Sequence, residues 1–77
     1  MKLSPTAIAD LCRSLGLAVL LEPATGRRCY SATDGRGIRV YWTVSLKGGL
    51  LGLPRVINRG VDTHAKSLRE VRYLIRA

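Results

Sequence analysis

The sequence is short of acidic residues. It contains no phenylalanine, one histidine and two cysteines, and its five Asp plus Glu stand against thirteen Lys plus Arg, a net charge of +8 over 77 residues. Such a surplus on a small surface attracts polyanions, and added salt weakens the attraction. The preference for arginine over lysine has two interpretations, a GC-rich genome or the fit of the guanidinium fork to phosphate, but a GC-rich genome would not explain the excess of basic residues. The composition therefore favours nucleic acid or an acidic protein surface as the partner.

Long apolar runs are also absent. The longest, Leu17 to Leu21, is far shorter than the roughly 20 residues of a membrane-spanning helix. Ser4 and Pro5 come too early to leave room for the apolar segment of a signal peptide. We therefore expect no membrane contact and a cytoplasmic location.

The residues that carry metal and catalytic chemistry are few. Cys12 and Cys29 are too few and too far apart for a zinc site, and a reducing compartment argues against a disulfide between them. His64 stands beside Asp62 and Thr63, where we expect Asp62 to cap a helix and His64 to be exposed in its first turn. No nucleophile motif and no phosphate-binding loop is present, so we expect no metal, no cofactor and no enzyme activity.

The first half of the chain predicts one helix and three strands. Ser4 suits the N-cap, Pro5 the first helical position and Gly16 the end of this helix. Its apolar face is formed by Ile8, Leu11, Cys12 and Leu15. The predicted strands are 17–22, 27–32 and 38–46, and the Asp34-Gly35 step between the last two predicts a hairpin. Alternation in the last strand places Ile38, Val40, Trp42 and Val44 on the core side and Arg39, Tyr41, Thr43 and Ser45 on the solvent side.

Residues 47–60 have two interpretations. Residues 50–58 are compatible with a further strand, but Pro54 would restrict it to the edge of a sheet, and a glycine-rich flap is the alternative. Leu50, Leu51 and Leu53 are the best candidates for exposed apolar side chains, and their exposure would indicate a homodimer contact.

The C-terminal stretch predicts a second helix that begins at Asp62 or Thr63. Its core face contains Leu68, Val71, Leu74 and Ile75, and the opposite stripe contains Lys66, Arg69, Tyr73 and Arg76. This stripe is either a phosphate-contacting surface or only the solvated side of a helix. The predicted fold is a single small α+β domain, a two-layer sandwich with about three antiparallel strands and both helices on one face.

This order of elements resembles the double-stranded-RNA-binding domain. The residues that match are Gly60, Thr63 and the step Ala65-Lys66, which in that family opens the second helix. The family's lysine pair is missing here, and His64 lies in its neighbourhood. Small basic messenger-RNA-cleaving toxins with a similar fold also resemble the chain in outline, although their Gly-Ser-His motif is absent. The resemblance implies contact with RNA phosphates from the second helix.

Three functions remain open from the sequence. The first is a nucleic-acid-binding module with little sequence specificity. Its candidate binding residues are Lys66, Arg69, Tyr73, Arg76, Arg39, Tyr41, Arg27, Arg28 and Arg36. The same residues are the candidates for contact with an acidic protein partner. The second is a protein-binding inhibitor or adaptor of a phage or plasmid, of the anti-CRISPR type. The third is a toxin-like ribonuclease that uses Arg39, Tyr41 or His64.

Overall fold

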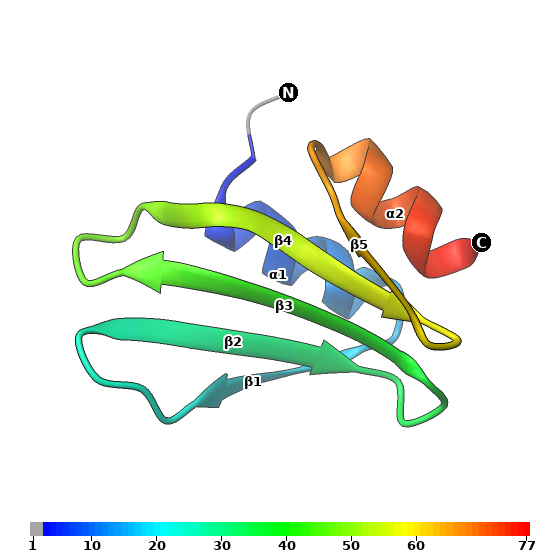
Figure 1. Cartoon of the computed structure of the whole chain (residues 1–77), viewed down its shortest axis with the longest axis horizontal. Coiled ribbons are helices and arrows are strands. Elements are labelled where there is room, and N and C mark those ends of the chain that lie inside the picture. The colour runs from blue at the N-terminus through cyan, green and yellow to red at the C-terminus, as the bar shows by residue number, and fades with distance from the viewer. Residues whose placement is uncertain (1–2) are drawn as a thin grey trace.

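The chain forms a small α+β domain with two helices and one antiparallel sheet. A computed structural model describes residues 3–77 (Figure 1). Its elements are α1 (Pro5–Ser14), β1 (Ala18–Glu22), β2 (Arg27–Thr33), β3 (Ile38–Ser45), β4 (Leu50–Asn58), β5 (Val61–His64) and α2 (Leu68–Arg76). Among these residues no helix is both long and apolar enough to cross a membrane.

The sheet has five strands, so the prediction of about three was too low. Their order is β1-β2-β3-β4-β5, and each strand pairs with the next one in the sequence. The Asp34-Gly35 hairpin joins β2 to β3, where Asp34 Oδ1 accepts hydrogen bonds from the amides of Arg36 (2.7 Å) and Ile38 (3.2 Å). The added strands are β4, which the sequence left open, and β5, which it assigned to a helix.

Local signals set both ends of α1. The Ser4 hydroxyl accepts a hydrogen bond from the amide of Ala7, and Pro5 occupies the first turn. At the other end Gly16 adopts a left-handed φ of 85°. The amide of Gly16 then donates to the carbonyl of Arg13, and that of Leu17 to the carbonyl of Cys12, which is the Schellman arrangement. Leu17 is thereby turned into the core, where it is buried.

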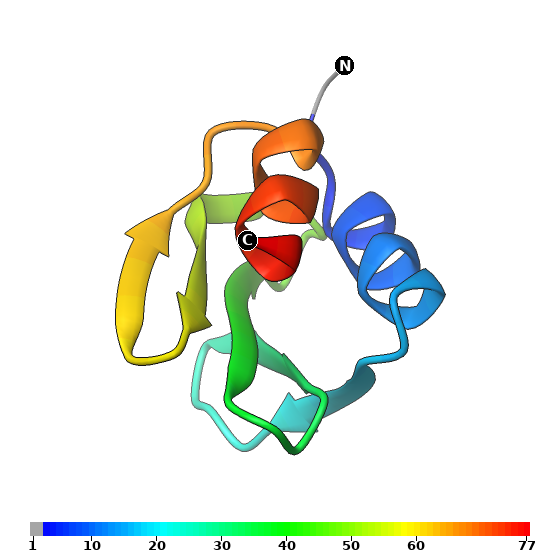
Figure 2. The ribbon, with the colours of Figure 1, turned by 90° about the vertical axis from the view of Figure 1, so that its right-hand side faces the viewer.

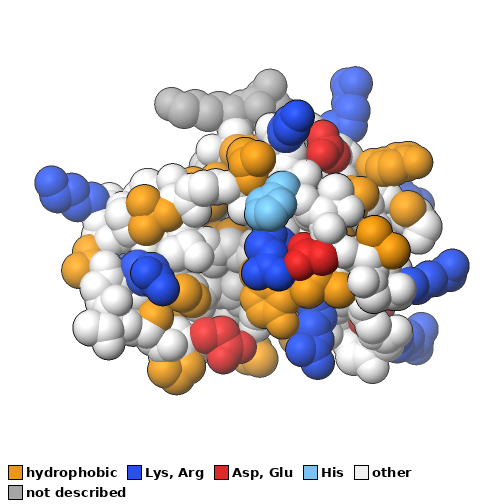
Figure 3. All heavy atoms as spheres, viewed as in Figure 1, with side chains coloured by type: hydrophobic (Ala, Val, Ile, Leu, Met, Phe, Trp, Pro, Cys, Tyr) orange, Lys and Arg blue, Asp and Glu red, His pale blue; other side chains and the backbone are white. Residues whose placement is uncertain are grey.

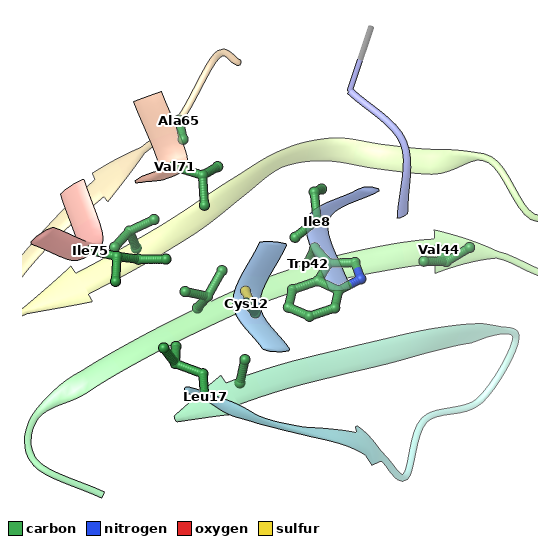
Figure 4. Packing of buried hydrophobic residues seen from close by; sticks show 11 residues of the cluster. Ile8, Cys12, Leu17, Trp42, Val44, Ala65, Val71 and Ile75 are labelled. Atoms are coloured by element: carbon green, nitrogen blue, oxygen red, sulfur yellow. The ribbon is translucent and has the colours of Figure 1, made fainter. Parts of the chain in front are cut away.

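Both helices lie on the concave side of the curved sheet (Figure 2). The core between the two layers contains Ile8 and Cys12 from α1, Val71 and Ile75 from α2, and Val40, Trp42 and Val44 from β3 (Figure 4). The Tyr30 ring stacks on Trp42 with centroids 5.6 Å apart. The other side of the sheet is covered by neither helix.

β4 is an interior strand in spite of Pro54, contrary to the expectation that proline confines it to an edge. Two features of its neighbours explain this. Pro54 lies just beyond the last β4–β5 pair, Arg55 with His64, and its carbonyl accepts from the amide of Ala65 at 2.8 Å. On the other side, the β3–β4 register shifts between Tyr41 and Thr43, so the missing N–H falls at an irregularity of the ladder.

α2 begins at Leu68, and the predicted start at Asp62 or Thr63 was wrong. Those two residues belong to β5, because the two-residue turn of Arg59 and Gly60 folds the chain back onto β4. The N-cap is Ser67, whose hydroxyl accepts from the amide of Glu70 at 3.1 Å. Lys66 therefore precedes the helix.

Candidate functional site

The outer surface of α2 carries three arginines and a tyrosine, Arg69, Arg72, Tyr73 and Arg76, and we call it the α2 arginine face. All four side chains are exposed, and that of Tyr73 is 69% exposed. They occupy one side of the helix because Val71 and Ile75 are buried on the other. Seven residues at 1.5 Å each separate Arg69 from Arg76 by about 10 Å along the axis. The face is thus a compact cationic strip beside one accessible aromatic ring.

The spacing of these arginines opposes helix stability. Arg69 and Arg72 are i,i+3 neighbours, and Arg72 and Arg76 are i,i+4 neighbours, so each pair repels by roughly 0.2–0.5 kcal/mol. Glu70 is the sole acidic residue in α2, and it is spaced three or four residues from none of the arginines. Neither ion pair found within residues 3–77 includes an arginine of α2. Arg76 lies in the last turn, where the helix dipole favours a cation, but no acidic side chain of the helix offsets the two like-charge contacts.

The α2 arginine face is hollowed rather than flat. Arg69 and Arg72 line a groove between the helices together with Leu11 of α1 and Ser67 and Leu68 at the start of α2. Arg69, Arg72, Tyr73 and Arg76 line a second hollow farther along the helix. Side chains of three arginines thus line shallow concave surface along one side of α2.

The uncovered side of the sheet is a second polar surface, but its charges are mixed. The Nη1 of Arg39 donates to the hydroxyl of Tyr41 at 3.4 Å, which joins two candidate residues on β3. The Arg55 guanidinium lies 5.8 Å from the centre of the Tyr41 ring. This half-buried ring therefore already has a cation over it and is less free to stack on a base than Tyr73 is.

An acidic residue partly neutralises this sheet surface. Arg55 Nε donates to Asp62 Oδ1 at 3.3 Å, and Arg55 Nη2 donates to Asp62 Oδ2. This pair lowers the pKa of Asp62 and raises the pKa of Arg55. Basic, acidic and apolar side chains are interspersed across the whole face, with the single histidine near its centre (Figure 3). Its charges are more mixed than those of the α2 arginine face.

The structure distributes the other predicted binding residues over separate surfaces. Arg27 lies on the uncovered side of β2, opposite Ser45. Arg28 points to the other side, where it lines a groove between α1 and the sheet together with Arg13. Arg36 lies in the β2–β3 turn, and Lys66 lies in the segment before α2. The nine candidate residues do not form one site.

The leucine segment of β4 is only partly exposed. Leu50 pairs with Val44 and packs against the core, so it is half-buried. Leu51 and Leu53 are 48% and 44% exposed. Two of the three proposed contact residues are therefore accessible.

The histidine does not lie in a helix. His64 ends β5, opposite Arg55 on the uncovered sheet face, and Asp62 pairs with Arg55 instead of capping a helix. Arg39, Tyr41 and His64 thus share one face of the sheet, on strands separated by β4. Within residues 3–77, no group of three or more His, Cys, Asp or Glu is placed to hold a metal ion.

Sequence reasoning missed Arg72 and the pairing of Arg55 with Asp62, which it treated only as a helix cap. Arg72 was left out because the stripe extended to Lys66, which would lie about 120° from Arg72 around a helix but precedes α2. The local signal for the true start was present, since Ser67-Leu68-Arg69-Glu70 has the capping-box pattern. The Arg55–Asp62 pair had no local signal, because it depends on the pairing of β5 with β4.

Comparisons of the chain with protein families, with curated proteins and with solved structures gave no match. The resemblance to the double-stranded-RNA-binding domain also departs from the structure at the residues that carried it. Ala65 and Lys66 do not open the second helix, and Thr63 lies in a strand.

Proposed function

We propose that the protein binds nucleic acid through the α2 arginine face, by contacts with phosphates and with little sequence specificity. The observation that carries the proposal is the exposed cluster of Arg69, Arg72 and Arg76, whose mutual repulsion is relieved by no acidic neighbour in the helix. Phosphate oxygens would supply the missing negative charge and accept bidentate hydrogen bonds from the guanidinium groups.

Tyr73 would add a preference for single strands, which phosphate contacts alone do not give. Its ring is exposed beside the arginines, so a base that is free of a duplex can stack on it. Base–aromatic stacking contributes about 1–3 kcal/mol per base. We therefore expect single strands to bind at least as well as duplexes, and Tyr73→Ala to weaken single-strand binding while Tyr73→Phe preserves it.

The test is fluorescence anisotropy with labelled single strands and duplexes of RNA and DNA, over roughly 50–300 mM salt. Three arginine–phosphate contacts predict a slope of log affinity against log salt of about −2.7 on duplex DNA. The variant Arg72→Glu/Arg76→Glu should lose most of the binding. The matched control is Arg36→Glu/Lys47→Glu, which makes the same charge change in two exposed turns of the sheet.

The control separates a local site from the effect of net charge. Equal losses in the two double variants would contradict the α2 arginine face as the site. If no oligonucleotide binds at about 50 mM salt, nucleic acid is excluded, and the arginines would instead need an acidic protein partner, detectable as a nuclease-resistant co-purifying protein. The same incubations test the ribonuclease alternative, because labelled RNA that stays full-length excludes cleavage.

A further inference from the structure

The outer edge of β1 is unpartnered. β1 is the first strand in the sheet order, and no other element of the described chain lies beyond it (Figure 1). Such an edge presents unpaired N–H and C=O groups to any other strand, and proteins usually protect it with a lysine, a proline or a bulge. Ala18, Val19, Leu20 and Leu21 include none of these. The opposite edge, β5, is shorter and carries Asp62 and His64.

Two large apolar side chains are exposed on this edge strand. Leu20 is 55% exposed and pairs with Ser31 on the uncovered face of the sheet. Leu21 is 61% exposed and pairs with Tyr30 on the face that bears the helices. The edge is therefore apolar on both faces, as expected of a strand that continues into a larger sheet.

The charge pattern favours a second copy of this chain as the partner. Residues 14–26 form the longest stretch without lysine or arginine and contain one acidic residue, Glu22. In a protein of net charge +8, this stretch itself adds no basic side chain to a contact between two copies, and the nearest cations are Arg13 and Arg28, which line the groove beside Val19. Glu22 is also drawn toward its own sheet, because Ser31 Oγ donates to Glu22 Oε1 at 2.8 Å.

We propose that two copies of the chain pair through β1, antiparallel and in a register centred on Leu20. This register opposes Leu20 to Leu20 of the second copy, Val19 to Leu21, and Ala18 to Glu22. It pairs all five residues of the strand without using Pro23, which has no N–H to donate, and it places the two Glu22 side chains at opposite ends of the contact. The product is one continuous sheet of two copies with the helices of both on the same side. The pairing does not depend on nucleic acid.

The oligomeric state gives the first test. Wild type should sediment as a concentration-dependent dimer, and Leu20→Lys should sediment as a monomer, because a charge at an edge strand opposes pairing. Leu20 is exposed, so the substitution spares the core. The matched control is Leu51→Lys, which is similarly exposed but lies on an interior strand, and it should remain dimeric. A wild type that stays monomeric up to about millimolar concentration would overturn the proposal, as would a dimer lost in Leu51→Lys but kept in Leu20→Lys.

Cross-linking tests the register. Opposed residues of antiparallel strands have Cα atoms about 4.5–5.5 Å apart, within reach of a disulfide. In a Cys29→Ser background, Leu20→Cys should form a covalent dimer under mild oxidation. Leu21→Cys introduces an equally exposed thiol that opposes Val19 of the second copy, about two residues out of register, and should cross-link poorly. Equal cross-linking of the two variants would contradict the register.

Discussion

Asn58 and Leu74 join the sheet to the last turn of α2. Asn58 Nδ2 donates a hydrogen bond to the carbonyl oxygen of Leu74 at 2.9 Å, and a second one to the carbonyl oxygen of Ala77 at the same distance. The last carbonyls of a helix have no partner within the helix, so a side chain from β4 satisfies two of them. This contact holds the C-terminal end of α2 on the sheet, in addition to the packing of Val71 and Ile75 in the core.

Replacing Asn58 should therefore destabilise the protein. Asn58→Ala leaves the partly buried carbonyl of Leu74 unpaired and should lower the free energy of unfolding by about 1–3 kcal/mol. Asn58→Asp should lower it more, because it removes the donors and places a negative charge at the negative end of the helix dipole. Urea denaturation of the two variants measures both effects. An aspartate variant as stable as wild type would show that the amide is not the donor.

The turn between β4 and β5 predicts a stabilising substitution. Arg59 has a φ of 53° and Gly60 a φ of 82°, as a two-residue type I′ hairpin loop requires. Asparagine adopts this conformation more readily than arginine, so Arg59→Asn should raise the free energy of unfolding by up to about 1 kcal/mol. Thermal unfolding measures the change. Arg59→Val should be clearly destabilising, because a β-branched side chain tolerates positive φ poorly.

Acid should destabilise the β2–β3 hairpin. Backbone hydrogen bonds, first from the amide of Arg36, lower the pKa of Asp34, and the pairing with Arg55 lowers the pKa of Asp62. Because these pKa values are lower in the folded state, the ionised carboxylates stabilise the fold above the ordinary aspartate pKa of about 3.9. This contribution is lost as the pH falls from there through the folded pKa values.

Denaturation midpoints at neutral pH and near pH 3 test whether the stability falls with the pH. Asp34→Asn keeps an acceptor oxygen but cannot ionise, so its stability should depend less on pH in this range than that of wild type. Asp10→Asn is the control, because its pairing with Arg13 is long, 3.5 Å, and highly exposed. If Asp34→Asn loses as much stability in acid as wild type does, the ionisation of Asp34 is not the cause of that loss.

The two cysteines should differ in reactivity. Burial raises the pKa of the Cys12 thiol to about 11, and its side chain is fully covered. Cys29 is half-buried on the uncovered sheet face. A thiol reagent at neutral pH should therefore modify one cysteine per native chain, and Cys29→Ser should abolish this rapid reaction. Rapid modification of the Cys29→Ser variant would mean that α1 opens readily from the sheet.

Elements with strong local signals were predictable from the sequence. Ser4, Pro5 and Gly16 each favour one position in α1, so the caps alone define its ends. The alternation of β3 placed Val40 and Trp42 in the core, and the structure buries both. At these positions, the conformation is favoured by the residue and its near neighbours.

Elements that depend on distant pairing were not predictable in the same way. Asp62 and Thr63 are good helix caps, but they form a strand because Arg59 and Gly60 return the chain to β4. Pro54 is accepted inside the sheet only because of where the neighbouring ladders end or shift. In both cases the neighbouring strand decides the conformation.

The candidate site also combines features that local sequence predicts with features that depend on distant strands. Arg69, Tyr73 and Arg76 share a face because of helical periodicity, which the sequence displays. Lys66 was included because the start of the helix was misplaced, and Arg72 was omitted for the same reason. The contact of Arg55 with Tyr41 on the sheet surface needed the three-dimensional register.

The order of the strands also has a kinetic consequence. Because every strand pairs with its successor through a short turn, the sheet can form by a series of local loop closures, each of which has a small entropic cost. The contact between α1 and α2 instead joins the two ends of the described chain. Low contact order speeds folding, so the hairpins should form early and the α1–α2 contact last. Substitutions in the turns should then change the folding rate, and substitutions between the helices should mainly change the unfolding rate.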